Sequence, residues 1–223
     1  GSRAGSCSPS TGNERPPAVL PAGGRDRRGM MSFSCRLPAE PSMTMRLDPA
    51  TSLLCVIDVQ ERLLAAMPDG RQVVERATRL ASAAALLGVR TVLTEQYPSG
   101  LGPTIPSLAA KLPPPMTKMS FSCLGCEGFV GALPPAVGTA VLCGLETHVC
   151  ILQTGLDLLA RGWIVFVAVD AVASRHRLDH DTAVARLAAS GGIPTTTEAV
   201  LFEWCRSADH PQFQTVRRLV LDR

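Results

Sequence analysis

The feature that most constrains the fold of this chain is the segment 142–150, Leu-Cys-Gly-Leu-Glu-Thr-His-Val-Cys, which joins a buried strand to a helix. Residues 140–143 form an apolar run, which is typical of a short strand covered on both faces. From Val149 to Leu159, apolar residues recur at helical spacing. A buried strand that leads directly into an amphipathic helix is the repeating unit of parallel α/β sheets.

The same alternation runs from residue 46 to the C-terminus. Apolar runs predict six strands, at residues 53–58, 89–94, 116–119, 139–143, 164–169 and 192–195. Amphipathic segments predict helices at residues 70–87, 126–133, 148–161, 179–190, 199–208 and 212–221. Strands alternating with helices indicate a three-layer α/β/α domain around a six-stranded parallel sheet of Rossmann-like type.

Cys150 stands at the beginning of one of these helices. With Thr147 as the N-cap, Cys150 is the third helical residue, where an anion gains from unpaired backbone N–H groups and from the helix dipole. A thiolate is stabilised there and its pKa falls. The segment alone leaves a second interpretation about equally open, in which Cys150 is a buried cysteine that packs as a small hydrophobe.

Two further polar residues favour the chemical interpretation. Asp58 ends the first predicted strand, and Lys118 belongs to the third. Because the carboxyl ends of parallel strands meet at one edge of a sheet, an acid, a cation and a thiol would converge in one crevice. The alternatives are that Asp58 caps the following helix and that Lys118 is a solvated charge at a strand end.

Three motifs resemble the signatures of the isochorismatase-like cysteine hydrolases. They are residues 56–60 (Val-Ile-Asp-Val-Gln), Lys118 with 120–122 (Ser-Phe-Ser), and 144–150 (Gly-Leu-Glu-Thr-His-Val-Cys). The resemblance covers roughly residues 46–223. Within this superfamily, residues 94–98 and 101–104 are most similar to the subgroup called isochorismatase domain-containing proteins.

The resemblance implies a Rossmann-like isochorismatase fold and a catalytic triad of Asp58, Lys118 and Cys150. Asp58 would accept the thiol proton, Lys118 would hold Asp58 ionised, and Cys150 would attack a carbonyl carbon. The resemblance also implies an oxyanion hole from the N–H groups of Glu146 and Cys150, with a cis Leu145–Glu146 peptide bond.

The expected reaction is cysteine-dependent hydrolysis of a C–N bond in a small amide or ureide. Isochorismatases proper cleave a vinyl ether, and some of them lack the cysteine that this chain retains, so vinyl-ether hydrolysis is an alternative. A third possibility is a binding or scaffold protein that keeps the fold without turnover.

The expected substrate is a small, partly apolar molecule. Residues 96–106 form a Gly- and Pro-rich loop that would lie at the ligand edge of the sheet. The predicted lining residues are Leu64, Gln96, Tyr97 and Phe121.

No metal ion or other cofactor is expected. Nicotinamidase relatives bind a metal through an Asp-x-His pair after the second strand, but residues 94–97 of this chain are Thr-Glu-Gln-Tyr. His176 and His180 are four residues apart and could chelate a metal, yet their charged neighbours indicate a solvated helix start. The Cys-x-x-Cys motif at 123–126 is interpreted as local packing, because no second pair accompanies it.

The charge distribution gives no support for nucleic acid as a partner. Residues 1–45 hold six arginines and three acidic residues, so of the 22 basic and 19 acidic residues in the chain, 16 of each remain in 46–223.

Residues 1–45 have the composition of a disordered extension, interpreted as a transit peptide or as sequence upstream of a start at Met43 or Met45. No membrane partner is expected either. We expect a cytoplasmic homo-oligomer without disulfides.

Overall fold

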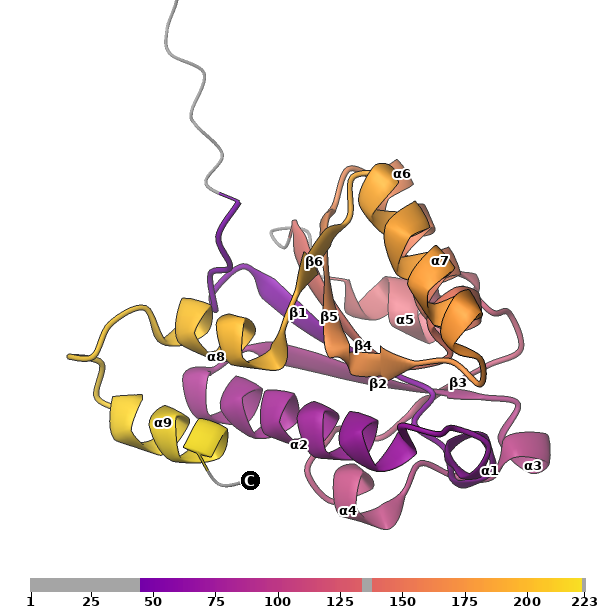
Figure 1. Cartoon of the computed structure of the whole chain (residues 1–223), viewed down its shortest axis with the longest axis horizontal. Helices are drawn as coiled ribbons and strands as arrows, with labels where there is room; N and C mark the ends of the chain where they lie inside the picture. Colours follow the sequence, from indigo (N-terminus) through magenta and orange to yellow (C-terminus); the bar gives the residue numbers. More distant parts are fainter. Residues whose placement is uncertain (1–44, 134–137, 222–223) are drawn as a thin grey trace, which may run out of the picture. The chain divides into compact units, whose positions relative to one another are not determined.

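The computed structural model describes residues 45–133 and 138–221, and the predicted extension therefore lies, apart from Met45, outside the described residues. Six described strands form one parallel sheet in the order β3-β2-β1-β4-β5-β6 (Figure 1). They are β1 (Ser52–Ile57), β2 (Arg90–Gln96), β3 (Met116–Lys118), β4 (Thr139–Leu145), β5 (Ile164–Ala173) and β6 (Ile193–Thr195). The predicted α/β class with six parallel strands is confirmed.

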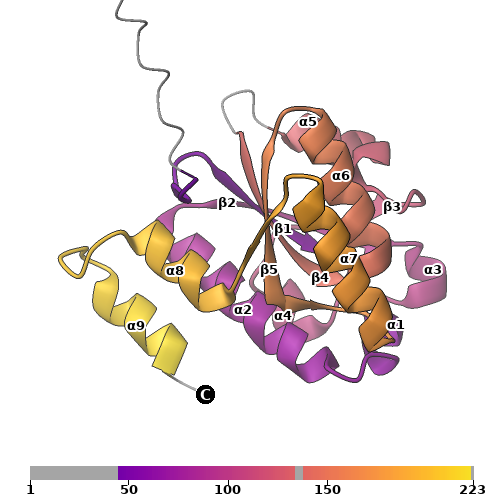
Figure 2. The ribbon, with the colours of Figure 1, turned by 45° about the horizontal axis from the view of Figure 1, so that its top comes forward.

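Helices cover both faces of the sheet, with α2, α8 and α9 on one side and α5, α6 and α7 on the other (Figures 1 and 2). The longer helices are α2 (Gly70–Leu87), α5 (Glu127–Ala132), α6 (Leu152–Ala160), α7 (Arg177–Ala189), α8 (Thr197–Cys205) and α9 (Phe213–Leu221). Single turns that the sequence pattern did not predict are α1 (Glu61–Ala65), α3 (Pro98–Leu101), α4 (Pro106–Ala109) and the 3₁₀ turn η1 (Cys123–Gly125). Among the described residues, no helix combines the length and the apolar character needed to cross a membrane.

The two faces of the sheet bury separate apolar clusters because strand side chains alternate. In β1, Leu54 and Val56 pack with α2, α8 and α9. Leu53, Cys55 and Ile57 pack with α5, α6 and α7. All six residues of β1 are buried, as expected for a central strand of a parallel sheet covered on both sides.

The strand order reverses between β1 and β4, and the carboxyl ends of the strands at such a reversal are where open parallel sheets generally bind ligands. Gly144, near the end of β4, has φ 121°, and a Cβ on it would lie 1.9 Å from the carbonyl oxygen of Ile57. Asp58 directly follows β1 with φ 53°, so the backbone leaves the sheet at that residue. Glycine therefore lets β4 approach β1 closely where both strands deliver their functional side chains.

The structure differs from the predicted boundaries at β5 and at the Cys150 turn. β5 continues past the predicted end at residue 169 and pairs again with β4 after an irregularity. Asp170 interrupts its apolar run but is neutralised within the sheet, since it accepts hydrogen bonds from Thr197 and pairs with Arg76. The predicted N-cap at Thr147 is wrong, because residues 147–151 form a π-helical turn, η2 (Thr147–Ile151), whose N-cap is Glu146.

Candidate active site

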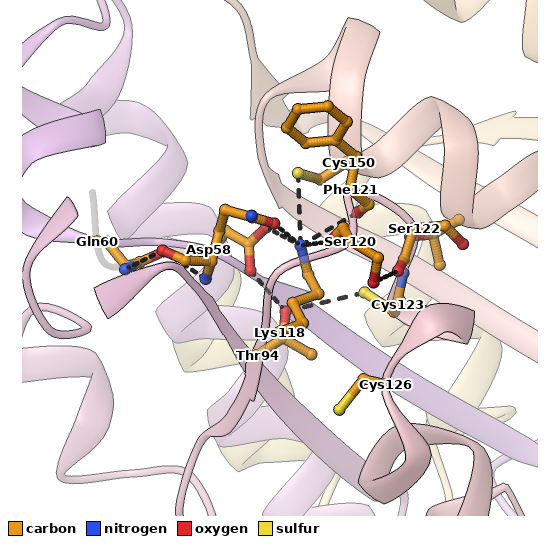
Figure 3. A network of polar contacts seen from close by, with 12 residues as sticks. Asp58, Gln60, Thr94, Lys118, Ser120, Phe121, Ser122, Cys123, Cys126 and Cys150 are labelled. Atoms are coloured by element: carbon orange, nitrogen blue, oxygen red, sulfur yellow. Dashed lines mark hydrogen bonds and ion pairs between the residues drawn. The ribbon is translucent and has the colours of Figure 1, made fainter. Parts of the chain in front are cut away.

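The structure brings Asp58, Lys118 and Cys150 together at the carboxyl ends of β1, β3 and β4 (Figure 3). The Lys118 ammonium group lies between the other two, with Nζ 2.6 Å from Oδ2 of Asp58 and 3.5 Å from Sγ of Cys150. The side chains of Asp58 and Lys118 are both fully buried. Three groups from distant parts of the sequence thus form one buried cluster.

The Lys118 ammonium group has more hydrogen-bond acceptors within reach than it has N–H groups to donate. An ammonium group donates three N–H bonds. The acceptors within reach are Asp58 Oδ2 at 2.6 Å, Gln96 Oε1 at 2.8 Å, the Phe121 carbonyl at 3.1 Å, the Ser120 carbonyl at 3.3 Å and Cys150 Sγ at 3.5 Å. Burial lowers the pKa of Lys118, but the charge of Asp58 and the contacts with Asp58 and Cys150 outweigh burial, so the pKa is raised. Lys118 is therefore a cation with no proton to spare for a second anionic partner.

Asp58 is fixed through both carboxylate oxygens. Oδ2 accepts from Lys118, and Oδ1 accepts from the Thr94 hydroxyl at 2.8 Å. Thr94 comes from β2, and its carbonyl oxygen accepts from the Asp58 N–H group at 3.1 Å. Backbone and side chain of Asp58 are thus both tied to β2, which sets the direction in which the carboxylate faces Cys150.

Cys150 is buried and lies in the π-helical turn η2. Burial raises the pKa of its thiol well above the ordinary value, Asp58 raises the pKa further, and Lys118 opposes these effects only in part. The expectation of a thiolate stabilised by a helix N-terminus is therefore wrong in this structure. Cys150 is a neutral thiol at neutral pH, hydrogen-bonded with the carboxylate that could take its proton.

The Leu145–Glu146 peptide bond, for which the resemblance implied a cis form, is cis. The Glu146 carboxylate points to the end of β5, where its Oε2 accepts from the backbone N–H of Arg175 at 3.3 Å and from its guanidinium at 3.1 Å. The N–H group of Ile151 donates back to the Glu146 carbonyl at 3.2 Å. These contacts fix the turn that carries Cys150.

The four predicted lining residues lie in different environments. Leu64 packs with the cluster of Met67, Val73, Leu145 and Ala173. Gln96 is buried with both ends of its amide in use, because Nε2 donates to the Met119 carbonyl at 2.8 Å. Tyr97 and Phe121 are 48% and 53% exposed, and the Phe121 carbonyl oxygen accepts from Lys118 at the site. Met119, at 69% exposure, adds a third apolar side chain on the same loops.

Cys123, of the Cys-x-x-Cys motif, and His180, of the histidine pair, each contact a threonine hydroxyl in the structure. In the described part of the chain, no group of three or more His, Cys, Asp or Glu residues could hold a metal ion. Cys123 is buried, which raises the pKa of its thiol to about 11, and its Sγ lies 3.8 Å from the Thr94 hydroxyl. His180 contacts the Thr147 hydroxyl at 3.0 Å, so it braces the Cys150 turn.

Sequence reasoning assigned no role to Thr94 or to Gln60. Both are buried, and each bonds to a residue 36 positions away, Thr94 to Asp58 and Gln60 to Gln96. Gln60 belongs to the motif at 56–60, which was the one signal that could have drawn attention to it. Thr94 could have been found only from the strand register, because Thr94 of β2 pairs with Ile57 of β1, the residue before Asp58.

Comparisons with known proteins agree with this geometry. Residues 52–199 match the model of the isochorismatase domain. Isochorismatase domain-containing protein 2 of Bos taurus is 43% identical over 175 residues, covering 78% of this chain and 85% of the relative. A structure described as the MAR1 ribonuclease of Caenorhabditis elegans has 38% identity and a TM-score of 0.72, covering 79% of this chain and 92% of the other.

A third similar structure is YcaC of Pseudomonas aeruginosa, described with hexane-2,5-diol and covalent acrylamide. It has 26% identity and a TM-score of 0.73, and the match covers 79% of this chain and 92% of that chain. The family model and the Bos taurus relative each cover well over half of this chain. The chain therefore belongs to the isochorismatase family of hydrolases.

Proposed function

We propose that this chain hydrolyses a C–N bond of a small amide or ureide, with Cys150 as nucleophile, Asp58 as acid and base, and Lys118 as the cation that orients both. The observation that carries the proposal is the buried contact of one ammonium group with a carboxylate at 2.6 Å and a thiol at 3.5 Å. Buried groups of this kind, with strongly raised thiol pKa, are typical of functional sites.

The raised pKa of Cys150 determines the order of events. Asp58 takes the thiol proton as the sulfur attacks the carbonyl carbon, and the carbonyl π electrons move to the oxygen. The N–H groups of Glu146 and Cys150 are the proposed donors to that oxyanion. The carbonyl then re-forms, the C–N bond breaks, and Asp58 returns the proton to the leaving nitrogen, which leaves a thioester on Cys150.

Water completes the reaction. Asp58 accepts a proton from the attacking water, the C–S bond breaks, and the proton returns to the sulfur, so the products are a carboxylic acid and an amine. For a ureide the acid product is a carbamic acid. The Lys118 ammonium group bonds Oδ2 directly and so orients the Asp58 carboxylate through these steps.

The charge balance of the site supports an uncharged substrate. Asp58 and Lys118 neutralise each other, Cys150 is a neutral thiol, and Lys118 already has five acceptors. An anionic substrate would bring charge next to Asp58 without a free proton of Lys118 to bind it. The exposed side chains of Tyr97, Met119 and Phe121 supply apolar surface. This favours a neutral amide over isochorismate-type vinyl ethers that carry carboxylates.

The ribonuclease description of the Caenorhabditis elegans structure suggests RNA as a second substrate class. The equal numbers of basic and acidic residues in 46–223 do not favour it, since RNA binding needs excess positive charge. A screen with neutral carboxamides, ureides, carbamates, a carboxylate-bearing vinyl ether and single-stranded RNA separates these options. We expect turnover of a neutral amide or ureide by the wild type and none by Cys150→Ala; turnover of RNA or of the vinyl ether alone would refute the proposal.

The same screen tests the scaffold alternative. A protein without catalytic function turns over none of the substrate classes, and its Asp58→Asn variant behaves as the wild type does. Homo-oligomerisation stays a prediction, which light scattering on the purified chain measures.

A further inference from the structure

We propose that Gln96 is a positioning residue that fixes the Lys118 ammonium between Asp58 and Cys150, and that Gln60 holds Gln96 in place for this role. The inference rests on the proposed function in that Lys118 is taken to act on Cys150. It replaces the prediction that Gln96 lines the substrate pocket, because the Gln96 amide has no free end to offer a substrate.

The orientation of the Gln96 amide follows from its two partners. Its nitrogen lies 2.8 Å from the carbonyl oxygen of Met119, which can only accept. Its oxygen therefore faces Lys118 Nζ, which can only donate, at 2.8 Å. Gln96 is a buried residue, 7% exposed as a whole, and its bond to Lys118 is buried, so water competes little for that bond.

Gln96 differs from the other acceptors of Lys118. The Ser120 and Phe121 carbonyls belong to the loop after β3, whereas Gln96 belongs to β2 and pairs in register with Lys118 itself. Apart from the Cys150 thiol itself, it is the only neutral side chain among these acceptors. The contact of Lys118 with Cys150 is the longest of the five, at 3.5 Å, so it is the first to be lost if the ammonium moves toward Asp58.

After the β1 backbone leaves the sheet, the Gln60 side chain bonds the β2 backbone in place of a strand neighbour. The β1–β2 pairing ends at Ile57 and Thr94, because Asp58 turns away with φ 53°. Beyond that point the Gln60 side chain bonds the backbone of Gln96 on both sides, accepting from its N–H at 2.8 Å and donating to its carbonyl at 3.0 Å. A further bond of 2.6 Å to the Gly102 carbonyl ties down the following loop. On the side of Gln96 where β1 no longer pairs, the Gln60 side chain thus holds the extended backbone, while β3 pairs with Gln96 on the other side.

The experiment measures the rate at which iodoacetamide, a neutral reagent, alkylates Cys150, followed by mass spectrometry of the Cys150 peptide between pH 6 and 10. The titratable groups around this thiol are Asp58 directly after β1, Lys118 from β3 and, next to Asp58, Cys123 from η1. We expect Gln96→Met to slow alkylation about tenfold at neutral pH, as a rise of one unit in the thiol pKa would do. Gln153→Met, at an exposed glutamine on α6, is the matched control and should react as the wild type does.

A double-mutant cycle separates positioning from general destabilisation. If Gln96 acts through Lys118, then Gln96→Met has no further effect on the alkylation rate in a Lys118→Met background. Gln60→Met should slow alkylation in the same direction, and this effect should also vanish in that background. Wild-type alkylation in Gln96→Met, or slowing that multiplies with that of Lys118→Met, would overturn the inference.

Two further results keep the test decisive. Gln96→Leu, which also lacks an acceptor for Lys118, serves if Gln96→Met does not fold, and it should slow alkylation only when Lys118 is present. The assay needs no substrate. A chain that hydrolyses nothing in the screen but shows the coupled alkylation rates would reject the proposed function and support the positioning role.

Discussion

Removing the Lys118 cation should make Cys150 markedly less reactive. In Lys118→Met the side chain keeps most of its length and loses its charge. At the 3.5 Å separation of Nζ and Sγ, an effective dielectric constant of 20 gives an attraction of about 5 kcal/mol for the thiolate. This is an upper bound, because Asp58 also loses its partner and the buried groups around the thiol would rearrange.

We therefore expect alkylation of Cys150 by iodoacetamide at neutral pH to slow about tenfold to a hundredfold, which corresponds to one to two units of thiol pKa. Lys111→Met is the matched control, since Lys111 is the other lysine of the chain and is exposed. The same variants should be compared by the mass of the Cys150 peptide over time. Equal rates in wild type and Lys118→Met would refute the electrostatic coupling of Lys118 to the thiol.

The fold must be monitored in the same experiment. Breaking an ion pair whose two side chains are fully buried costs about 3–5 kcal/mol of unfolding free energy, because the remaining charge is left unpaired. The double variant Asp58→Asn/Lys118→Met removes both charges and should regain much of that stability. If it recovers a wild-type melting temperature and still alkylates slowly, the loss of reactivity cannot be attributed to unfolding.

Three other variants or conditions test the site and the fold. Asp58→Asn keeps the size of the side chain but cannot take the thiol proton, so turnover should fall at least about a hundredfold while substrate binding persists; normal turnover would exclude Asp58 as acid and base. Gly144→Ala would place a Cβ 1.9 Å from the Ile57 carbonyl oxygen and should cost about 3 kcal/mol or more in chemical denaturation, whereas Gly131→Ala, which meets open space, should not. Burial raises the thiol pKa values above the unfolded value of about 8.5 at four cysteines: Cys55, Cys123, Cys143 and Cys150. The stability that these thiols contribute is therefore complete below about pH 8.5 and is lost as the pH rises, so the melting temperature should fall between pH 9 and pH 11, the pKa of Cys123 being about 11. A melting temperature that does not change over this range would contradict their burial as thiols.

The sequence was sufficient for the sheet and for the convergence of Asp58, Lys118 and Cys150. Buried parallel strands appear in the sequence as apolar runs. A polar residue at the carboxyl end of such a run must lie at the edge of the sheet where ligands bind. The longer helices were predictable for the same reason, since their apolar faces repeat over several turns.

The parts that sequence reasoning missed depend on contacts across the sheet. The role of Thr94 follows from its register with Ile57, and the role of Gln60 follows from the positive φ of Asp58, neither of which a local pattern encodes. The π-helical turn before α6 cannot be distinguished from an α-helical start by apolar spacing over five residues. The raised pKa of Cys150 is likewise a property of the buried surroundings, because burial outweighs the benefit of the nearby Lys118.

The most direct measurement is the mass of the Cys150 peptide during turnover of a slow neutral amide. If Cys150 is the nucleophile, the peptide gains the mass of the acyl group, the adduct disappears as water releases the acid, and Cys150→Ala abolishes both adduct and turnover. Cys126→Ala, at the partly exposed cysteine of the nearby loop, is the control and should retain both. Activity should also survive exhaustive chelation. Turnover in Cys150→Ala, or activity lost to a chelator and restored by a metal ion, would contradict hydrolysis by a cysteine nucleophile.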